Sequence, residues 1–217
     1  MACILLNLDM IFSIIRTGID ATGRDLSVIS NNLANASTNG FKRSEAQFED
    51  IYQSHHNNST EVARGMGVKT IKPRQNFSQG SFQQTNGSLD LAIMGEGFFV
   101  LGEKGHITVK NGPFHVDESG LIHFDGKISD SFRLVRFRHQ DQLQKLGRGF
   151  FAPVNKDDLP KVSSNIQIKQ GILEDSNVNS MLEMTRMISA TRAYESVHKA
   201  LSRIDRLDEK AISMLQA

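Results

Sequence analysis

The residues of this chain that could do chemistry begin with its seven histidines. His55 and His56 are adjacent in a polar stretch, so their side chains tend to point apart, unlike the spaced ligands of a metal site. His115 and His123 fall in expected strands, and His198 lies beside an apolar helical stripe. No matching Cys or His–Glu pattern accompanies them. We therefore expect surface or packed histidines, with no metal site and no cofactor.

Two charged clusters are the next candidates. Asp117 and Glu118 are adjacent at an expected hairpin tip, where carboxylates are usually solvated, and nothing places them as an acid and a base. Arg133, Arg136 and Arg138 form a basic cluster that is compatible with a phosphate site or with a solvated strand face. Their spacing does not put all three on one strand face, which favours the solvated surface.

Nucleotide-binding and nucleophile motifs are missing from the sequence. Gly95-Glu-Gly97 lacks the third Gly and the following helix of a dinucleotide fingerprint, so it indicates a turn. No Gly-x-Ser-x-Gly elbow occurs. We predict no catalytic residue and no enzymatic activity.

The overall composition excludes several classes of protein. The 25 basic and 24 acidic residues nearly balance, which gives no reason to expect a nucleic-acid partner. Cys3 is the single cysteine, so an internal disulfide is excluded. No apolar stretch reaches the roughly 18 residues of a membrane span. Met1–Arg16 superficially resembles a signal peptide, but it lacks a basic start and a clean cleavage site.

The first element that must position any site is a helix from about Met10 to Phe41. Its apolar or small residues alternate steps of four and three, which is a heptad seam. Asn39-Gly40 is a turn signal that ends it. The pattern fits a coiled coil and a single amphipathic helix packed on its own domain about equally well. The seam consists of Ile15, Ile19, Thr22, Leu26, Ile29, Leu33 and Ala36.

The middle of the chain has short apolar runs separated by Gly turns, which indicates a small antiparallel sheet or a barrel-like domain. Near its start, the polar stretch Ser54–Thr60 predicts a mobile loop. The expected strands are Leu89–Met94, Gly97–Leu101, His106–Lys110, Pro113–Val116, Leu121–Phe124 and Ser131–Arg138.

A long helix is expected from about Asn177 to Ala217, with Ser176 or Asn177 as its N-cap. About 40 residues at 1.5 Å each span roughly 60 Å, more than the roughly 45 Å diameter of a compact body of this chain length. An unbroken helix would therefore overhang and need a partner, whereas two shorter helices could fold back. Its stripe consists of Met181, Met184, Ile188, Thr191, Tyr194, Val197, Leu201, Ile204, Leu207, Ala211 and Met214.

These elements predict an α+β fold in which the two terminal helices pair as a coiled-coil-like stalk with an inserted, mainly antiparallel β domain. We expect three segments: 1–43 as N-terminal helix and signature turn, 44–170 as the β-rich outer domain with a mobile loop near 53–64, and 171–217 as the long C-terminal helix.

The segment Asn31–Arg43, Asn-Asn-Leu-Ala-Asn-Ala-Ser-Thr-Asn-Gly-Phe-Lys-Arg, resembles the signature of bacterial flagellar rod and hook proteins. Gln79–Thr85 with Leu89–Val100 is similar to the central motif of that family. Gln170–Asn179, followed by Arg192-Ala-Tyr-Glu195, is similar to its C-terminal signature. The motifs are long, occur in the family's order and cover both ends and the centre of the chain.

The resemblance implies a structural subunit of the flagellar basal-body rod, the axial drive shaft of motility, with no catalytic site and no cofactor. It would be exported through the flagellar type III apparatus without a cleaved signal peptide. Its partners would be other rod subunits and the export apparatus, with copies of itself as a further candidate. Its terminal helices would pack into the inner tube, with the β domain outside.

The position along the rod is open. Phe48–Tyr52 resembles the distal-rod subunit, whereas the short chain slightly favours a proximal-rod subunit. The short middle of the chain disfavours a hook subunit, whose β region is much longer. The stretch Phe124–Gln170 is abbreviated relative to typical rod subunits, and Thr108–Gly112 lacks the family's Tyr. Family members usually begin shortly before the equivalent of Thr17-Gly18, so we expect Met10 to be the true start.

The helical seams and the signature asparagines form the candidate assembly interface. A β-rich ligand-binding module with helical arms is the alternative from another class, with a concave site expected within 85–124. The interface candidates are Ile15, Ile19, Leu26, Ile29, Leu33, Asn31, Asn32, Asn35, Met181, Met184, Ile188, Tyr194, Leu201, Ile204 and Leu207.

Overall fold

The computed structural model of this chain describes residues 2–57, 60–100, 114–124, 127–132, 134–147, 150–154, 161–162 and 167–215. The chain divides into two compact units. The helical unit comprises Met1–Ala34, Ser44–Arg74 and Asn179–Ala217. The sheet unit comprises Asn35–Arg43 and Gln75–Val178.

Two long helices form most of the helical unit: α1 spans Ala2–Ala34 and α2 spans Ser180–Leu215. This confirms the prediction of a helix at each end of the chain, and α1 extends further towards the N-terminus than the expected Met10. α2 is unbroken over 36 residues, which corresponds to about 54 Å. The alternative of two shorter C-terminal helices is therefore wrong.

Asn179 caps the start of α2. Its side-chain Oδ1 accepts the N–H of Leu182 at 3.1 Å, and its carbonyl accepts the first intrahelical bond from Glu183 at 3.0 Å. The prediction of Ser176 or Asn177 as N-cap is wrong, because the side chain of Asn177 bonds to other segments of the sheet unit.

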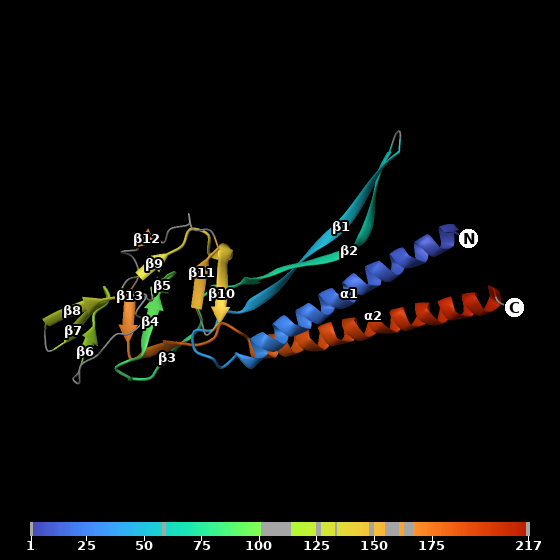
Figure 1. The fold of residues 1–217 in the computed structure, drawn as a ribbon. Coiled ribbons are helices and arrows are strands. Elements are labelled where there is room, and N and C mark those ends of the chain that lie inside the picture. The colour runs from blue at the N-terminus through green and yellow to red at the C-terminus, as the bar shows by residue number, and fades with distance from the viewer. Residues whose placement is uncertain are drawn as a thin grey trace. The chain divides into compact units, whose positions relative to one another are not determined.

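α1 and α2 lie side by side in opposite directions, so that both chain ends lie at the same end of the pair (Figure 1). Two contacts give the alignment. Asn32 Nδ2 lies 3.2 Å from Glu183 Oε2, and a Cβ placed on Gly18 would lie 3.9 Å from Val197 Cγ1. Gly18 lies fourteen residues before Asn32 on α1, and Val197 lies fourteen residues after Glu183 on α2. The two contacts are therefore about 21 Å apart along each helix. The helices are thus antiparallel and in one register over that length.

A two-stranded hairpin completes the helical unit, with β1 spanning Ser44–Asn57 and β2 spanning Thr60–Gln75. These strands replace the loop that the polar sequence near 53–64 predicted, except at residues 58 and 59, which lie outside the described part. A two-stranded ladder pairs backbone groups whatever the polarity of its side chains, which explains the difference.

Gly67 fits the hairpin against α1. Its φ is +114°, and a Cβ there would lie 2.3 Å from Thr17 Oγ1. The same hydroxyl oxygen accepts the N–H of Val68 at 3.2 Å and donates to the carbonyl of Ile14 at 2.7 Å. A side chain on residue 67 would therefore prevent β2 from packing this closely against α1.

The sheet unit consists of short strands, and every strand pair with a described register in it is antiparallel. Its small sheets have the strand orders β10-β11, β12-β9-β5, β13-β4, β14-β3 and β6-β7-β8. The strands are β3 (Phe82–Gln84), β4 (Leu91–Met94), β5 (Phe98–Phe99), β6 (Phe114–Val116), β7 (Leu121–Phe124), β8 (Lys127–Ser131), β9 (Leu134–Arg136), β10 (Leu143–Gly147), β11 (Phe150–Pro153), β12 (Lys161–Val162), β13 (Gln167–Gln170) and β14 (Ile172–Glu174). A 3-10 turn spans Gln140–Gln142.

An aliphatic core holds these strands together. Its buried members are Ile93, Val116, Ile122, Leu134 and Ile168. They come from five different strands, so no strand pair buries its apolar face alone. The antiparallel β middle predicted from the sequence is confirmed.

The predicted strands agree with the structure unevenly. Leu121–Phe124 is β7 as expected, whereas the single strand predicted over Ser131–Arg138 is wrong. The ladder is interrupted at Phe132, whose N–H donates to the carbonyl of Gly120 at 2.8 Å and whose ring packs against the core. The strand predicted at His106–Lys110 lies outside the described residues.

Candidate assembly site

The predicted seam of α1 lies only in part on the face that meets α2, because the other buried residues of this helix, Ala21 and Asn32, are outside the seam. Ile29 is 1% exposed, and Ile15, Ile19, Leu26 and Leu33 are half-buried. The outer face of α1 carries mainly polar or small residues, as a helix covered on one side requires. This outer face consists of Ile11, Ser13, Arg16, Asp20, Arg24, Ser27, Ser30, Asn31 and Ala34.

The predicted stripe of α2 separates into two faces. Tyr194, Leu201 and Ile204 are half-buried, whereas Met181, Met184 and Ile188 are exposed. Nothing is described for the side chain of Leu207. The covered face instead begins with the buried Glu183 and Ala190, one residue away from the expected apolar positions.

This covered face follows a heptad spacing. Its members are buried or half-buried and are separated by steps of four and three, the period of a helix that faces another helix along its whole length. They are Glu183, Met187, Ala190, Tyr194, Val197, Leu201 and Ile204. The apolar pattern of the sequence does not show the first half of this covered face, because a charged residue and an alanine occupy it. That the two helices pack as a coiled coil stays a prediction.

Three groups meet where the end of α1 lies beside the start of α2. Asn32 is fully buried, and its Oδ1 accepts the N–H of Ser44 at 2.9 Å. Its Nδ2 donates to the carbonyl of Ser44 at 2.8 Å and to Glu183 Oε2 at 3.2 Å. The amide thus ties both helices to the first residue of β1.

Glu183 is also fully buried, and its second carboxylate oxygen lies 3.4 Å from Arg186 Nη1. Asp25 lies on the same side of α1. Burial raises the pKa of Asp25 above its usual value, and the negative charge of Glu183 raises it further. The inner face of the helix pair therefore carries two acids that interact unfavourably when both are ionised.

The other signature asparagines lie elsewhere. Asn31 is exposed on α1, and Asn35 is half-buried in the turn that follows, where its carbonyl accepts the N–H of Thr38 at 3.1 Å. Of the three asparagines in the predicted interface, only Asn32 is placed between the helices.

A second polar cluster joins three segments of the sheet unit. Asn177 Oδ1 accepts the N–H of Arg43 at 2.7 Å, and its Nδ2 donates to the carbonyls of Asn76 and Ser78 at 2.8 and 3.0 Å. The side chain of Asn177 therefore satisfies backbone N–H and carbonyl groups in segments 40–43 and 76–78 that a neighbouring strand would otherwise satisfy.

Lys42 and Glu174 complete this cluster. Their side chains are only 15% and 17% exposed, and Lys42 Nζ lies 2.7 Å from Glu174 Oε1. The same carboxylate oxygen accepts the N–H of Gly80 at 2.8 Å, and the ammonium donates to the carbonyl of Ser78 at 3.0 Å. Sequence reasoning identified these residues only as parts of family motifs, because nothing local shows that they meet.

The chemical candidates are placed in structural roles. Asp117 Oδ1 accepts the N–H groups of Ser119 and Leu121 at 3.0 and 2.9 Å, and the bond from Leu121 is the main cause of its lowered pKa. Its Oδ2 lies 3.2 Å from His123 Nε2. Arg136 pairs with Glu96 at the surface. No three His, Cys, Asp or Glu side chains gather as metal ligands in the described part of the chain.

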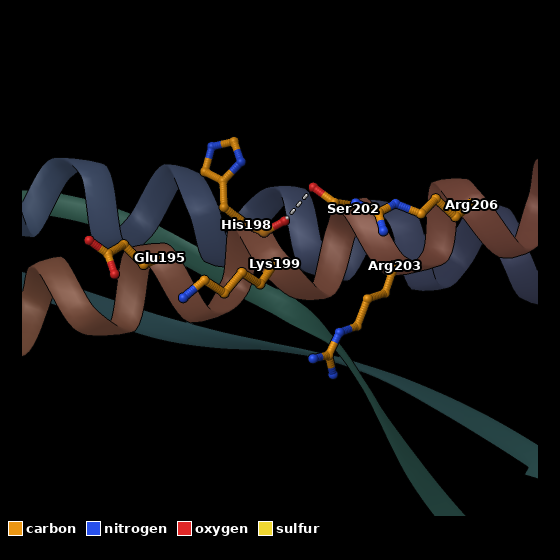
Figure 2. Close-up of a pocket in the computed structure, with 6 residues that line it drawn as sticks. All are labelled: Glu195, His198, Lys199, Ser202, Arg203 and Arg206. Atoms are coloured by element: carbon orange, nitrogen blue, oxygen red, sulfur yellow. Dashed lines mark hydrogen bonds between the residues drawn. The ribbon is translucent and has the colours of Figure 1, made fainter.

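A shallow depression lies on the exposed side of α2 (Figure 2). Figure 2 shows its six lining side chains on that single helix, with Ser202 Oγ donating to the carbonyl of His198 at 3.1 Å. This depression lies outside 85–124, where the ligand-binding alternative expected a concave site. Its lining residues are Glu195, His198, Lys199, Ser202, Arg203 and Arg206.

Neither described helix is long and apolar enough to cross a membrane. In the helical unit, α1 and α2 pack together through one face each, and the other face of each helix is exposed.

Two sequence families match the ends of this chain. Residues 169–214 match the family described as flagellar basal body rod FlgEFG protein C-terminal, and residues 16–42 match the family described as flagella basal body rod protein. The first match includes most of α2, and the second contains most of the inner face of α1.

Relatives that align over most of their length are also flagellar basal-body rod proteins. The chain is 32% and 31% identical to the flagellar basal-body rod proteins FlgG of Buchnera aphidicola from Acyrthosiphon pisum and from Schizaphis graminum, each over 90% of this chain and 95% of the relative. It is 28% identical to the flagellar basal-body rod protein FlgF of Caulobacter vibrioides, over 88% of this chain and 92% of the relative. The FlgG alignments run over 248 residues, more than the 217 of this chain, so this chain has gaps relative to those relatives.

Proposed function

Because the chain belongs to the flagellar basal-body rod protein family, we propose that it joins neighbouring axial subunits through exposed apolar residues at the start of α2. It is a structural subunit of the basal-body rod, not an enzyme, and it is located in the flagellar basal body. Its partners are other axial flagellar subunits. The residues that make those contacts are what the proposal adds.

The type of rod subunit is part of the proposal. FlgG relatives match at 31% and 32% identity and the FlgF relative at 28%, so a FlgG-type subunit is favoured. The preference for a proximal over a distal position, which rested on chain length, stays a prediction.

The observation that carries the proposal is the exposed apolar group at the start of α2. Met181, Leu182, Met184 and Ile188 are 77%, 53%, 50% and 56% exposed, although the opposite face of the same helix is covered by α1. Large apolar side chains gathered at one place on a surface are typical of a contact with another protein. We call these four residues the outer α2 patch.

Three of these residues belong to the stripe that the sequence predicted as an assembly interface. The stripe residues that α1 covers serve the internal helix pair, and the outer α2 patch remains available to a neighbour. Contacts with further copies of this chain, and export through the flagellar type III apparatus, belong to this proposal as well and rest on the family resemblance.

The experiment uses a strain that lacks the gene for this chain. A tagged full-length copy should restore swimming and co-purify with isolated basal bodies, whereas a copy without residues 177–217 should do neither. A full-length chain that is absent from basal bodies, or normal swimming with the shortened copy, would contradict the proposal.

A further inference from the structure

Two fully buried polar side chains face each other in the helix pair. Asn32 and Glu183 are both 0% exposed, and Ile29, one turn before Asn32, is 1% exposed. Burying an amide and a carboxylate costs free energy that apolar residues of similar volume would not cost. The pair therefore needs an explanation other than stability.

The hydrogen bonds of Asn32 fix its orientation. Its oxygen faces the N–H of Ser44, while its nitrogen faces the carbonyl of Ser44 and the carboxylate of Glu183. A flipped amide would place an oxygen against two acceptors and a donor against a donor. Both N–H donors of the amide are used, so the site accepts an acidic oxygen from α2 at one place only.

An apolar heptad seam alone does not choose between registers, since a slip of seven residues brings equivalent positions together. Sliding α2 by seven residues in one direction would place Glu183 opposite Asp25 and Asn32 beyond the start of α2. In the observed register, burial raises the pKa of Asp25 and the negative charge of Glu183 raises it further, so a closer approach of the two acids would be unfavourable.

Sliding α2 by seven residues in the other direction would place Asn32 opposite Ala190. The buried amide would then keep its bonds to Ser44 but lose the carboxylate acceptor on α2, and Glu183 would lie past the end of α1. One slipped register separates the two buried groups and the other brings two carboxylates together, and only the observed register pairs Asn32 with Glu183.

We propose that Asn32 and Glu183 form a register lock, a polar pair that selects the antiparallel alignment of α1 and α2 and thereby determines which α2 side chains face outward. Buried polar pairs set register in coiled coils by the same physics. The lock acts within one chain, so it is tested on the isolated full-length protein, independently of rod assembly.

Disulfide cross-links report the register. In a Cys3→Ser background, Gly18→Cys with Val197→Cys reports the observed register, because the two positions lie within reach of a disulfide. Gly18→Cys with Ala190→Cys and Gly18→Cys with Ile204→Cys report the two slipped registers. Each pair is oxidised at low protein concentration, and intramolecular cross-links are quantified on non-reducing gels.

The protein with an intact lock should cross-link only the first pair. Asn32→Leu with Glu183→Leu should raise the slipped cross-links about tenfold, the change expected when about 1.4 kcal/mol of discrimination is lost. Glu183→Gln keeps an acceptor for Asn32 and should retain the observed register. Thr22→Val is the matched control, since this hydroxyl donates within α1, to the carbonyls of Gly18 and Ile19.

If the double-leucine variant does not fold, Asn32→Leu alone decides, because it leaves the Glu183 carboxylate buried without the amide. It should raise the cross-link between 18 and 204, the register that moves Glu183 out of the pair. A leucine variant that is folded and cross-links only 18 to 197 would overturn the proposal. So would slipped cross-links of similar amount in the Thr22→Val control.

Discussion

Lys42 Nζ lies 2.7 Å from Glu174 Oε1, and neither side chain is more than 17% exposed. Lys42 follows the signature turn after α1, and Glu174 ends β14, shortly before α2. The pair thus connects the two chain segments that lead to the terminal helices, within the sheet unit.

The first prediction concerns this pair. Glu174→Gln should lower the free energy of unfolding by about 1–3 kcal/mol, because Lys42 would keep a buried charge without its carboxylate. Denaturant unfolding followed by circular dichroism measures the change. The control is Glu96→Gln, whose pair with Arg136 is more than half exposed and should contribute less than about 1 kcal/mol. Equal effects of both changes would contradict the buried role.

Gly67→Ala should destabilise the helical unit by about 2 kcal/mol or more, because its positive φ and the nearby Thr17 hydroxyl both exclude a Cβ. Gly65→Ala is a matched control in the same strand, since a Cβ there meets nothing within 4 Å. Thermal unfolding at 222 nm compares the two proteins. An unchanged Gly67→Ala midpoint would show that β2 does not pack on α1 as described.

Gly23→Ala should stabilise the isolated chain by about 1 kcal/mol, because glycine is a poor residue inside α1. A Cβ at residue 23 meets nothing within 4 Å. Gly40→Ala has equally open space but a φ of +68°, so it should destabilise the chain by about 1 kcal/mol. Thermal midpoints with opposite shifts are expected, and shifts of the same sign would contradict the backbone conformations.

Asp25→Asn should stabilise the protein at neutral pH. Since the pKa of Asp25 is raised in the folded state, its contribution to stability is fully present below the unfolded value of about 3.9 and is lost as pH rises through the folded pKa. The gap in unfolding free energy between variant and wild type should therefore widen from pH 4 to pH 7. A gap that narrows over this range would contradict the partial burial of Asp25 near Glu183.

Periodic patterns made part of this fold predictable from the sequence. The helices at both ends follow from apolar residues that recur every three or four positions, and β7 follows from a short apolar run between Gly turns. Both signals are local, so a single sequence contains them.

Long-range pairing accounts for what the sequence did not show. The burial of Glu183 cannot be predicted from local sequence, because a charged residue is expected at the surface unless its buried partner is known, and that partner, Asn32, lies 151 positions earlier. The β1–β2 hairpin was missed because its polar tip carries no strand pattern. Asn177 was assigned as a helix cap, whereas its amide serves segments 40–43 and 76–78, a role set entirely by tertiary structure.

The central claim is that the outer α2 patch joins neighbouring rod subunits. Met184→Lys with Ile188→Lys places two charges on the patch, while Ser196→Lys with Ser202→Lys adds the same charge at exposed serines elsewhere on α2. Both variants should unfold within about 0.5 kcal/mol of the wild type, as surface substitutions do.

The deciding measurement is the amount of each tagged variant in basal bodies isolated from a strain without the native gene. The account predicts that the serine variant is incorporated like the wild type and that the patch variant, although folded, is absent. Incorporation of the patch variant at the wild-type level would contradict the account.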